Sequence, residues 1–371
     1  MKKIIALTLV LVSLLSLVSC QKYKPVKSSD EESATVMTLT LEDKTYEVPY
    51  ELYRSFFLQL KTAVDGGDSS VWSGADKDEY IKKIDGMILS RITDIYALFH
   101  LCDKVGIDVY SKDVEKTLDK YVTASVDGGI VDGIIFEGFE GDYDAYLESL
   151  KKMNLNYSVQ KLLLRYSLAS ELLDFHYIGN FGEEEFVEDT VMGALKYTEE
   201  DVRNFYYSRE CVRVLEAFLS TADEVSSAIN TPEKAEKIRS LLLASATEYE
   251  AGTIIITNTL ATEDTRKGRI IARHNLDPMY YSELTEAAFS LGRLMPSEVI
   301  TLNTGYDNGY TIIIPVDKSD ENFKECYDDI AYAYLQNTIG TYIYETKTAL
   351  TESAVSTDLL ASLDRATVSI D

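Results

Sequence analysis

Four carboxylates lie close together in the segment VDGGIVDGIIFEGFEGD, residues 126–142. Asp127, Asp132, Glu137 and Asp142 could supply the oxygen ligands that calcium prefers. Their spacing does not match the Asp-x-Asp-x-Asp-Gly pattern, in which alternate residues of one tight loop face the ion. The glycines and acids predict a solvated surface loop, and we expect neither a metal nor a cofactor in this protein.

The second set of residues with possible chemistry is the three cysteines that follow the N-terminal region, Cys102, Cys211 and Cys326. An odd number of widely spaced cysteines does not form a disulfide framework. Flanking runs such as ALFHLCDKV and FKECYDDIAYAYL place them near apolar faces, which favours a structural role as small buried side chains. Their redox state stays open.

The N-terminus carries an export signal. Lys2 and Lys3 precede an apolar run over residues 4–18, which is shorter than the roughly 20 residues that span a bilayer. The next residues, LVSC, resemble a bacterial lipobox. The resemblance implies that residues 1–19 are a signal peptide and that Cys20 becomes the lipidated N-terminus; an ordinary secretory signal with a chance cysteine is the alternative. We therefore expect an extracytoplasmic, lipid-anchored protein with a polar tether over residues 20–36.

Composition narrows the classes of function. The 371 residues carry a formal net charge of −26, and no basic stripe offsets it. Such a surface repels phosphate backbones, so we exclude nucleic acid as a partner. Hydrophobic residues make up 46% of the chain, which is enough for packed cores, and the length predicts two or more domains.

Periodicity divides the remaining chain into three parts. Residues 37–196 begin with a strand–turn–strand pattern and continue as a series of amphipathic helices, one of them capped by Ser111. Residues 197–320 mix strands and helices. Residues 321–371 return to long-helix periodicity. This order predicts an α+β protein.

The middle part contains the patterns that carry the next inference. CVRVLEAFLS reads as a strand, and TPEKAEKIRSLLL as a helix with Pro232 in its first turn. GTIIITN and GRIIAR are short β-like runs. SELTEAAFSLG is a helix ending at Gly292, and SEVITL with GYTIIIPV predicts a hairpin.

These motifs resemble the parvulin-type peptidyl-prolyl isomerase domain. YTEEDVRNFYYS is similar to the helix before that domain, VRVLEAFLS to its first strand, and SELTEAAFSLG followed by GYTIII to its closing segment. The flanking helices resemble extracytoplasmic foldases of the PrsA and SurA class. The resemblance implies a mainly helical N-terminal chaperone module that a C-terminal helix completes, with the parvulin-like α+β domain inserted between them.

The sequence departs from the family where the family has its catalytic residues. Two family histidines on adjacent central strands correspond to Glu216 and Thr311. Tyr280 and Leu284 stand where the family often has Met and Phe in the proline pocket, and Phe289 is a further candidate for the substrate groove. Because both histidines are replaced, enzymatic activity stays uncertain.

Three functions stay open. The first is a membrane-anchored chaperone or foldase that binds unfolded, newly exported polypeptides, with a weak or inactive parvulin-like domain. The second is an active isomerase with a modified site, and the third is a scaffold or solute-binding lipoprotein. The 26 tyrosines suit the first, because each offers an apolar face and a hydroxyl to an extended chain. Many recur at helical spacing: Tyr327, Tyr332, Tyr334, Tyr342 and Tyr344.

Overall fold

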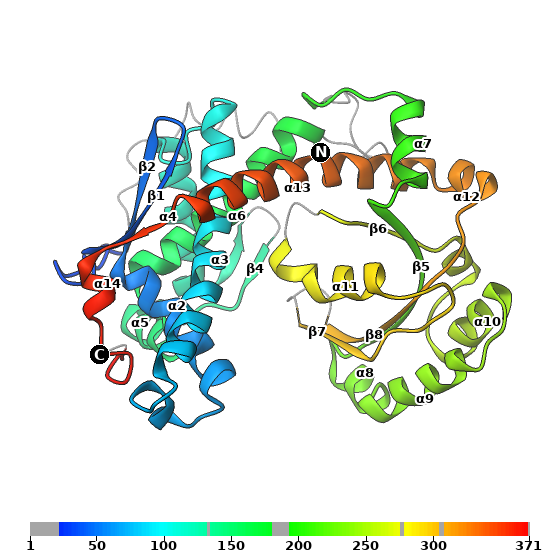
Figure 1. The fold of residues 1–371 in the computed structure, drawn as a ribbon, viewed down its shortest axis with the longest axis horizontal. Coiled ribbons are helices and arrows are strands. Elements are labelled where there is room, and N and C mark those ends of the chain that lie inside the picture. The colour runs from blue at the N-terminus through cyan, green and yellow to red at the C-terminus, as the bar shows by residue number, and fades with distance from the viewer. Residues whose placement is uncertain (1–21, 132–133, 180–192, 275–277, 304–307, 370–371) are drawn as a thin grey trace. The chain divides into compact units, whose positions relative to one another are not determined.

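The computed structural model describes residues 22–131, 134–179, 193–274, 278–303 and 308–369, and it has an α+β architecture (Figure 1). The chain divides into two compact units. Unit 1 holds the described residues of Met1–Leu173 and Tyr342–Asp371. Unit 2 holds those of Asp174–Glu184 and Asp189–Thr341. The sequence placed the corresponding boundaries after residues 196 and 320.

A three-stranded sheet of unit 1 joins segments near the two ends of the described chain. β1 (Thr35–Leu41) and β2 (Lys44–Pro49) form the expected hairpin, and β9 (Val355–Ser356) pairs antiparallel with the other edge of β1. Val36 and Leu39 are fully buried behind it. The first strand therefore needs the C-terminal segment as its neighbour.

Side chains reinforce this return of the C-terminal segment. Asp94 is 5% exposed and pairs with Lys347 at 2.7 Å. Arg365, which is also buried, pairs with Asp85 at 3.1 Å. Burial raises the pKa of Asp94, and the nearby ammonium opposes that rise. A buried carboxylate without its partner is strongly destabilising, so the C-terminal segment is an integral part of unit 1.

Helices make up most of unit 1. Ser111 caps α4 as expected, because its side chain accepts a hydrogen bond from the N–H of Val114. Asp142 caps α5 in the same way, and Gly66 in the left-handed region ends α2. The helices are α2 (Tyr50–Asp65), η2 (Ser69–Trp72), α3 (Lys77–Lys104), α4 (Lys112–Asp127), α5 (Tyr143–Lys152), α6 (Tyr157–Ile178), whose last residues belong to unit 2, and α14 (Asp358–Ser362).

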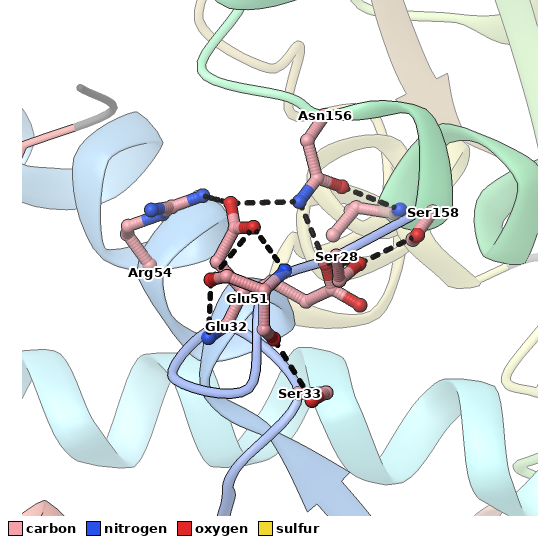
Figure 2. Close-up of polar contacts among 9 residues, drawn as sticks. Ser28, Glu32, Ser33, Glu51, Arg54, Asn156 and Ser158 are labelled. Carbon is pink, nitrogen blue, oxygen red and sulfur yellow. Dashed lines mark hydrogen bonds and ion pairs between the residues drawn. The ribbon is translucent and has the colours of Figure 1, made fainter. Parts of the chain in front are cut away.

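The segment that follows Lys22 lies along unit 1 and differs from the free tether expected over residues 20–36. Glu51, 7% exposed, accepts hydrogen bonds from Ser28 at 2.5 Å and from Asn156 at 2.6 Å (Figure 2). Glu32 pairs with Arg54 at 2.7 Å. Polar composition alone predicted a solvated chain, but these polar side chains have partners on α2 and at the start of α6.

Unit 2 is built on a four-stranded antiparallel sheet. Its order is β6-β5-β8-β7. The strands are β5 (Cys211–Ser220), β6 (Arg269–Ala272), β7 (Ile300–Asn303) and β8 (Asn308–Pro315). All four coincide with runs that the sequence predicted as strands. β5 and β8 are the central pair, in register from Val214↔Pro315 to Ser220↔Gly309.

Helices pack on both faces of this sheet. On one face, α9 (Pro232–Leu243) and α10 (Glu248–Asn258) pack against Leu215, Ala217 and Ile312. α11 (Pro278–Ser290) packs on the other face. α8 (Glu224–Ile229) connects β5 to α9. The alternation of side chains along each strand supplies both faces with apolar residues.

The prediction of a strand at GTIIITN was wrong, because these residues belong to α10. The isoleucines have strand propensity, but Thr247 caps the helix by accepting a hydrogen bond from the N–H of Glu250. Ala251 and Ile255, one helical turn apart, are fully buried against the sheet. Tertiary packing therefore overrides the local preference.

Arg213 is a buried cation in the core of unit 2. Its side chain is 1% exposed and pairs with Glu248 at 2.8 Å. It also donates hydrogen bonds to the carbonyls of Lys267, Arg266 and Asp317 at 2.6–2.8 Å. These partners satisfy the charge and join β5 to α10, to the turn before β6 and to the end of β8.

The remaining helices of unit 2 form a separate cluster. α7 (Glu199–Tyr207) begins with a capping box between Thr198 and Asp201. It packs against α12 (Asp320–Glu325) and the first turns of α13 (Tyr327–Glu352) through a core that includes Tyr206, Phe323 and Ile330.

Asp174, near the end of α6, predicts a pH-dependent stability. Burial raises its pKa to about 6, and a hydrogen bond from Gln336 Nε2 opposes the rise. Between pH 3.8 and about 6, Asp174 is protonated in the folded state but ionised in the unfolded state. The free energy of unfolding therefore falls as the pH rises through this window.

We expect Asp174→Asn to stabilise the protein by about 1–2 kcal/mol at pH 7.5 and to leave it unchanged near pH 3.5. Urea unfolding followed by circular dichroism at both pH values measures the difference. Glu345→Gln, at an exposed position in the middle of α13, is the control and should change neither curve. Equal stabilisation at both pH values would contradict the assignment.

Candidate functional site

Glu216 and Thr311, the two positions that the sequence analysis compared with family histidines, meet on one face of the central strand pair. Glu216 on β5 is opposite Ile313, and Thr311 on β8 is opposite Phe218, so Glu216 and Thr311 are diagonal neighbours. Thr311 Oγ1 donates a hydrogen bond of 2.8 Å to Glu216 Oε1. Thr311 is fully buried, and the Glu216 side chain is 17% exposed.

Arg269 completes this cluster, and the sequence analysis missed it. Its Nη1 lies 2.9 Å from Glu216 Oε2, so each carboxylate oxygen has a partner within unit 2. Arg269 begins β6, which is the neighbour of β5 in the sheet. In the sequence, Arg269 is recognisable only as a cation at the start of a short predicted strand. Only the strand order shows that this strand lies beside Glu216.

The expected groove residues have different environments. Leu284 on α11 is 2% exposed and belongs to the core between α11 and the sheet. Phe289 is partly buried, and the guanidinium of Arg273 lies over its ring at 4.3 Å. The side chain of Tyr280 lies outside the described part of the structure.

A shallow depression runs along the outer side of α11. It is lined by Arg273, Glu283, Glu286, Ala287, Phe289 and Ser290. Phe289 is one of the groove candidates that the sequence suggested, and the guanidinium of Arg273 lies over its ring.

The described residues provide no evident nucleophile or metal centre. Cys102, Cys211 and Cys326 are buried free thiols. Burial raises the pKa of Cys102 and that of Cys211 to about 12, so both stay protonated and unreactive at neutral pH. No group of three or more metal-ligating side chains occurs in the described ranges.

The tyrosines of α13 have mixed exposure. Tyr334 packs edge-on against Phe205 with ring centroids 5.7 Å apart, so it is a packing residue of unit 2. Tyr332, Tyr342 and Tyr344 are 41%, 37% and 56% exposed. Helical spacing alone could not separate these two groups.

Cys20 and the apolar run before it lie outside the described residues. Within the ranges that the structure describes, none of the helices combines the length and apolarity that crossing a membrane requires.

Comparisons with known proteins give distant similarities. No family model matches the chain, and no curated protein matches it. Among solved structures, it is similar to the foldase protein PrsA from Streptococcus pneumoniae, with 13% identity, a TM-score of 0.24, and coverage of 85% of this chain and 91% of that one.

Two further solved structures are similar at the same level. PrsA from Bacillus subtilis has 14% identity and a TM-score of 0.22, with 74% of this chain and 87% of that one covered. The foldase protein PrsA from Lactococcus lactis has 11% identity and a TM-score of 0.22, with 91% and 100% covered. Superpositions this loose carry no argument about function.

The Glu216–Thr311 contact predicts a specific pattern of stability. Thr311→Val keeps the shape but leaves Glu216 Oε1 without its donor, and we expect a loss of about 1–3 kcal/mol. Glu216→Leu combined with Thr311→Val removes both polar partners and should recover most of that loss. Urea unfolding of these two variants, of Glu216→Leu alone and of the original protein completes the cycle. A Thr311→Val protein as stable as the original would show that the contact contributes nothing.

Proposed function

We propose that this protein is a membrane-anchored extracytoplasmic chaperone or foldase that assists the folding of exported proteins. In this proposal Cys20 carries the lipid, residues 37–196 and 321–371 form the chaperone module, and residues 197–320 form a parvulin-like domain with weak or no isomerase activity. The clients are unfolded polypeptides.

Exposed apolar side chains on unit 2 are the observation that supports chain binding most directly. Val225 and Ile229, one turn apart on α8, are 70% and 59% exposed, and Tyr249 on α10 is 71% exposed. Leu260, after α10, is 93% exposed. Single exposed apolar residues are ordinary, but several on neighbouring elements provide contacts for an extended apolar chain.

The environment of Glu216 supports weak or absent catalysis. An isomerase must stabilise the twisted X–Pro amide against a barrier of about 18–20 kcal/mol, which needs groups available to the substrate. Both oxygens of Glu216 are instead bonded to Thr311 and Arg269, and Leu284 is part of the core. A residual effect through binding alone remains compatible with this arrangement.

The topology of unit 2 also bears on the alternatives. From β5 to β8 its elements follow the order β-ααα-β-α-β-β in an antiparallel sheet, whereas the sequence predicted one helix and a β-like run before β6. A solute-binding protein would contain repeated parallel βα units, and all strand pairs in the described residues are antiparallel. No observation favours that alternative.

We expect cis–trans exchange of a proline-containing tetrapeptide to proceed at the uncatalysed rate in the presence of this protein. The cause is that both carboxylate oxygens of Glu216 are already hydrogen-bonded, to Thr311 and to Arg269. A protease-coupled or NMR exchange assay measures it, with Glu216→His/Thr311→His tested alongside. Clear acceleration by the original protein would establish the isomerase alternative.

We also expect stoichiometric protein to suppress the aggregation of a reduced, unfolded client, as light scattering would show. Replacing Val225, Ile229, Tyr249 and Leu260 by serine should reduce protection at least about twofold, because these side chains supply apolar contact area. Glu236→Ser/Lys237→Ser, at exposed positions of α9 with no net charge change, is the matched control. If the original protein gives no protection, chaperone activity is refuted.

A further inference from the structure

The first described residues are bonded to the end of α4. Lys22 Nζ lies 2.7–2.8 Å from both carboxylate oxygens of Asp127, and the hydroxyl of Tyr23 donates to Asp127 Oδ1 at 2.6 Å. The Tyr23 ring stacks on Tyr143 at 5.0 Å, and the Tyr143 hydroxyl donates to the carbonyl of Lys24 at 2.9 Å. The chain therefore joins unit 1 at its second residue after Cys20.

The contacts shown in Figure 2 hold the same segment a few residues later. Ser28 donates to Glu51 and also shares a hydrogen bond of 2.8 Å with Ser158. Burial alone would raise the pKa of Glu32, but hydrogen bonds from Ser29 and Arg54 hold it at about 2, so it stays charged and paired at neutral pH. These contacts leave little free chain between position 20 and unit 1.

An apolar hairpin begins two residues after Asp127. β3 (Gly129–Val131) pairs with β4 (Ile134–Phe136), and Ile130 lies directly opposite Ile135. These two side chains share one face of the hairpin and are 71% and 76% exposed. On the other face, Phe136 packs on Tyr121 of α4 with ring centroids 6.1 Å apart. The hairpin is therefore supported from behind and presents an isoleucine pair outward.

We propose that Ile130 and Ile135 enter the bilayer interface next to the lipid on Cys20 and form a second membrane contact of unit 1. The proposal rests on the proposed lipid anchor. Two residues of extended chain span about 7 Å, so a lipidated Cys20 would lie close to Lys22 and to the base of the hairpin.

Charge favours a membrane as the occupant of this surface. Residues 21–27 contain Lys22, Lys24 and Lys27 and no acid, in a chain of net charge −26. Lys24 and Lys27 are exposed, and Lys22 compensates Asp127 at the hairpin base. Cations next to an anchor attract anionic lipid headgroups, and apolar side chains bury in the interface beneath them.

The test uses the lipidated protein in vesicles of phosphatidylglycerol and phosphatidylethanolamine with brominated acyl chains. Trp72 is 3% exposed and gives a constant background, so Ile135→Trp adds a surface reporter. We expect bromolipid to lower its fluorescence at least about twofold, as burial in the interface requires. Val355→Trp, at a 62% exposed position of unit 1, is the matched control and should not be quenched. Ile130→Trp serves as a second reporter.

The outcomes of this experiment distinguish the proposed hairpin contact from the proposed lipid anchor. If the original protein floats with the vesicles and Cys20→Ser does not, the lipid anchor is supported. If the original protein does not float, the anchor is refuted. Flotation without quenching of either isoleucine reporter refutes the membrane contact and leaves the anchor standing. A third outcome is that bromolipid does not quench Ile135→Trp, while a second copy or an unfolded client shields this tryptophan from aqueous iodide. That result would assign the hairpin to a protein partner and overturn the inference.

Discussion

Unit 1 depends on the pairing of its first strand with a strand from the far end of the chain. β1 and β9 are more than three hundred residues apart in the numbering, and their pairing requires residues 342–371 to return to the helices of residues 50–173. The buried Asp94 needs Lys347 from the returning segment, because an unpaired carboxylate in that position is costly. The described residues between 174 and 341 form a core of their own.

Unit 2 forms its core on the two apolar faces of its sheet. Two charged side chains of β5, Arg213 and Glu216, also lie in this region. Arg213 joins β5 to the ends of two neighbouring strands, and Glu216 is bonded to Thr311 and Arg269. Both groups are satisfied within the unit, so they stabilise and position the sheet.

Local pattern predicted most elements because apolar periodicity and caps act over one or two turns. It failed at residues 252–258, where the burial of Ile255 against the sheet overrides strand propensity, and at residues 22–34, where polar composition concealed partners on α2 and α6. It also missed Arg269 and the isoleucine hairpin. Those features depend on strand order and exposure, which spacing along the chain does not contain.

The sequence by itself determined the α+β class, the four strands of unit 2 and the Ser111 cap of α4. These follow from periodicity, hydrogen bonds between near neighbours and residue identity. Only the tertiary structure decided that Thr311 and Arg269 occupy both oxygens of Glu216, that Leu284 is buried, and that Lys22 is bonded to Asp127. Those contacts join residues far apart in the chain, and their energies exist only once the strands and helices have packed.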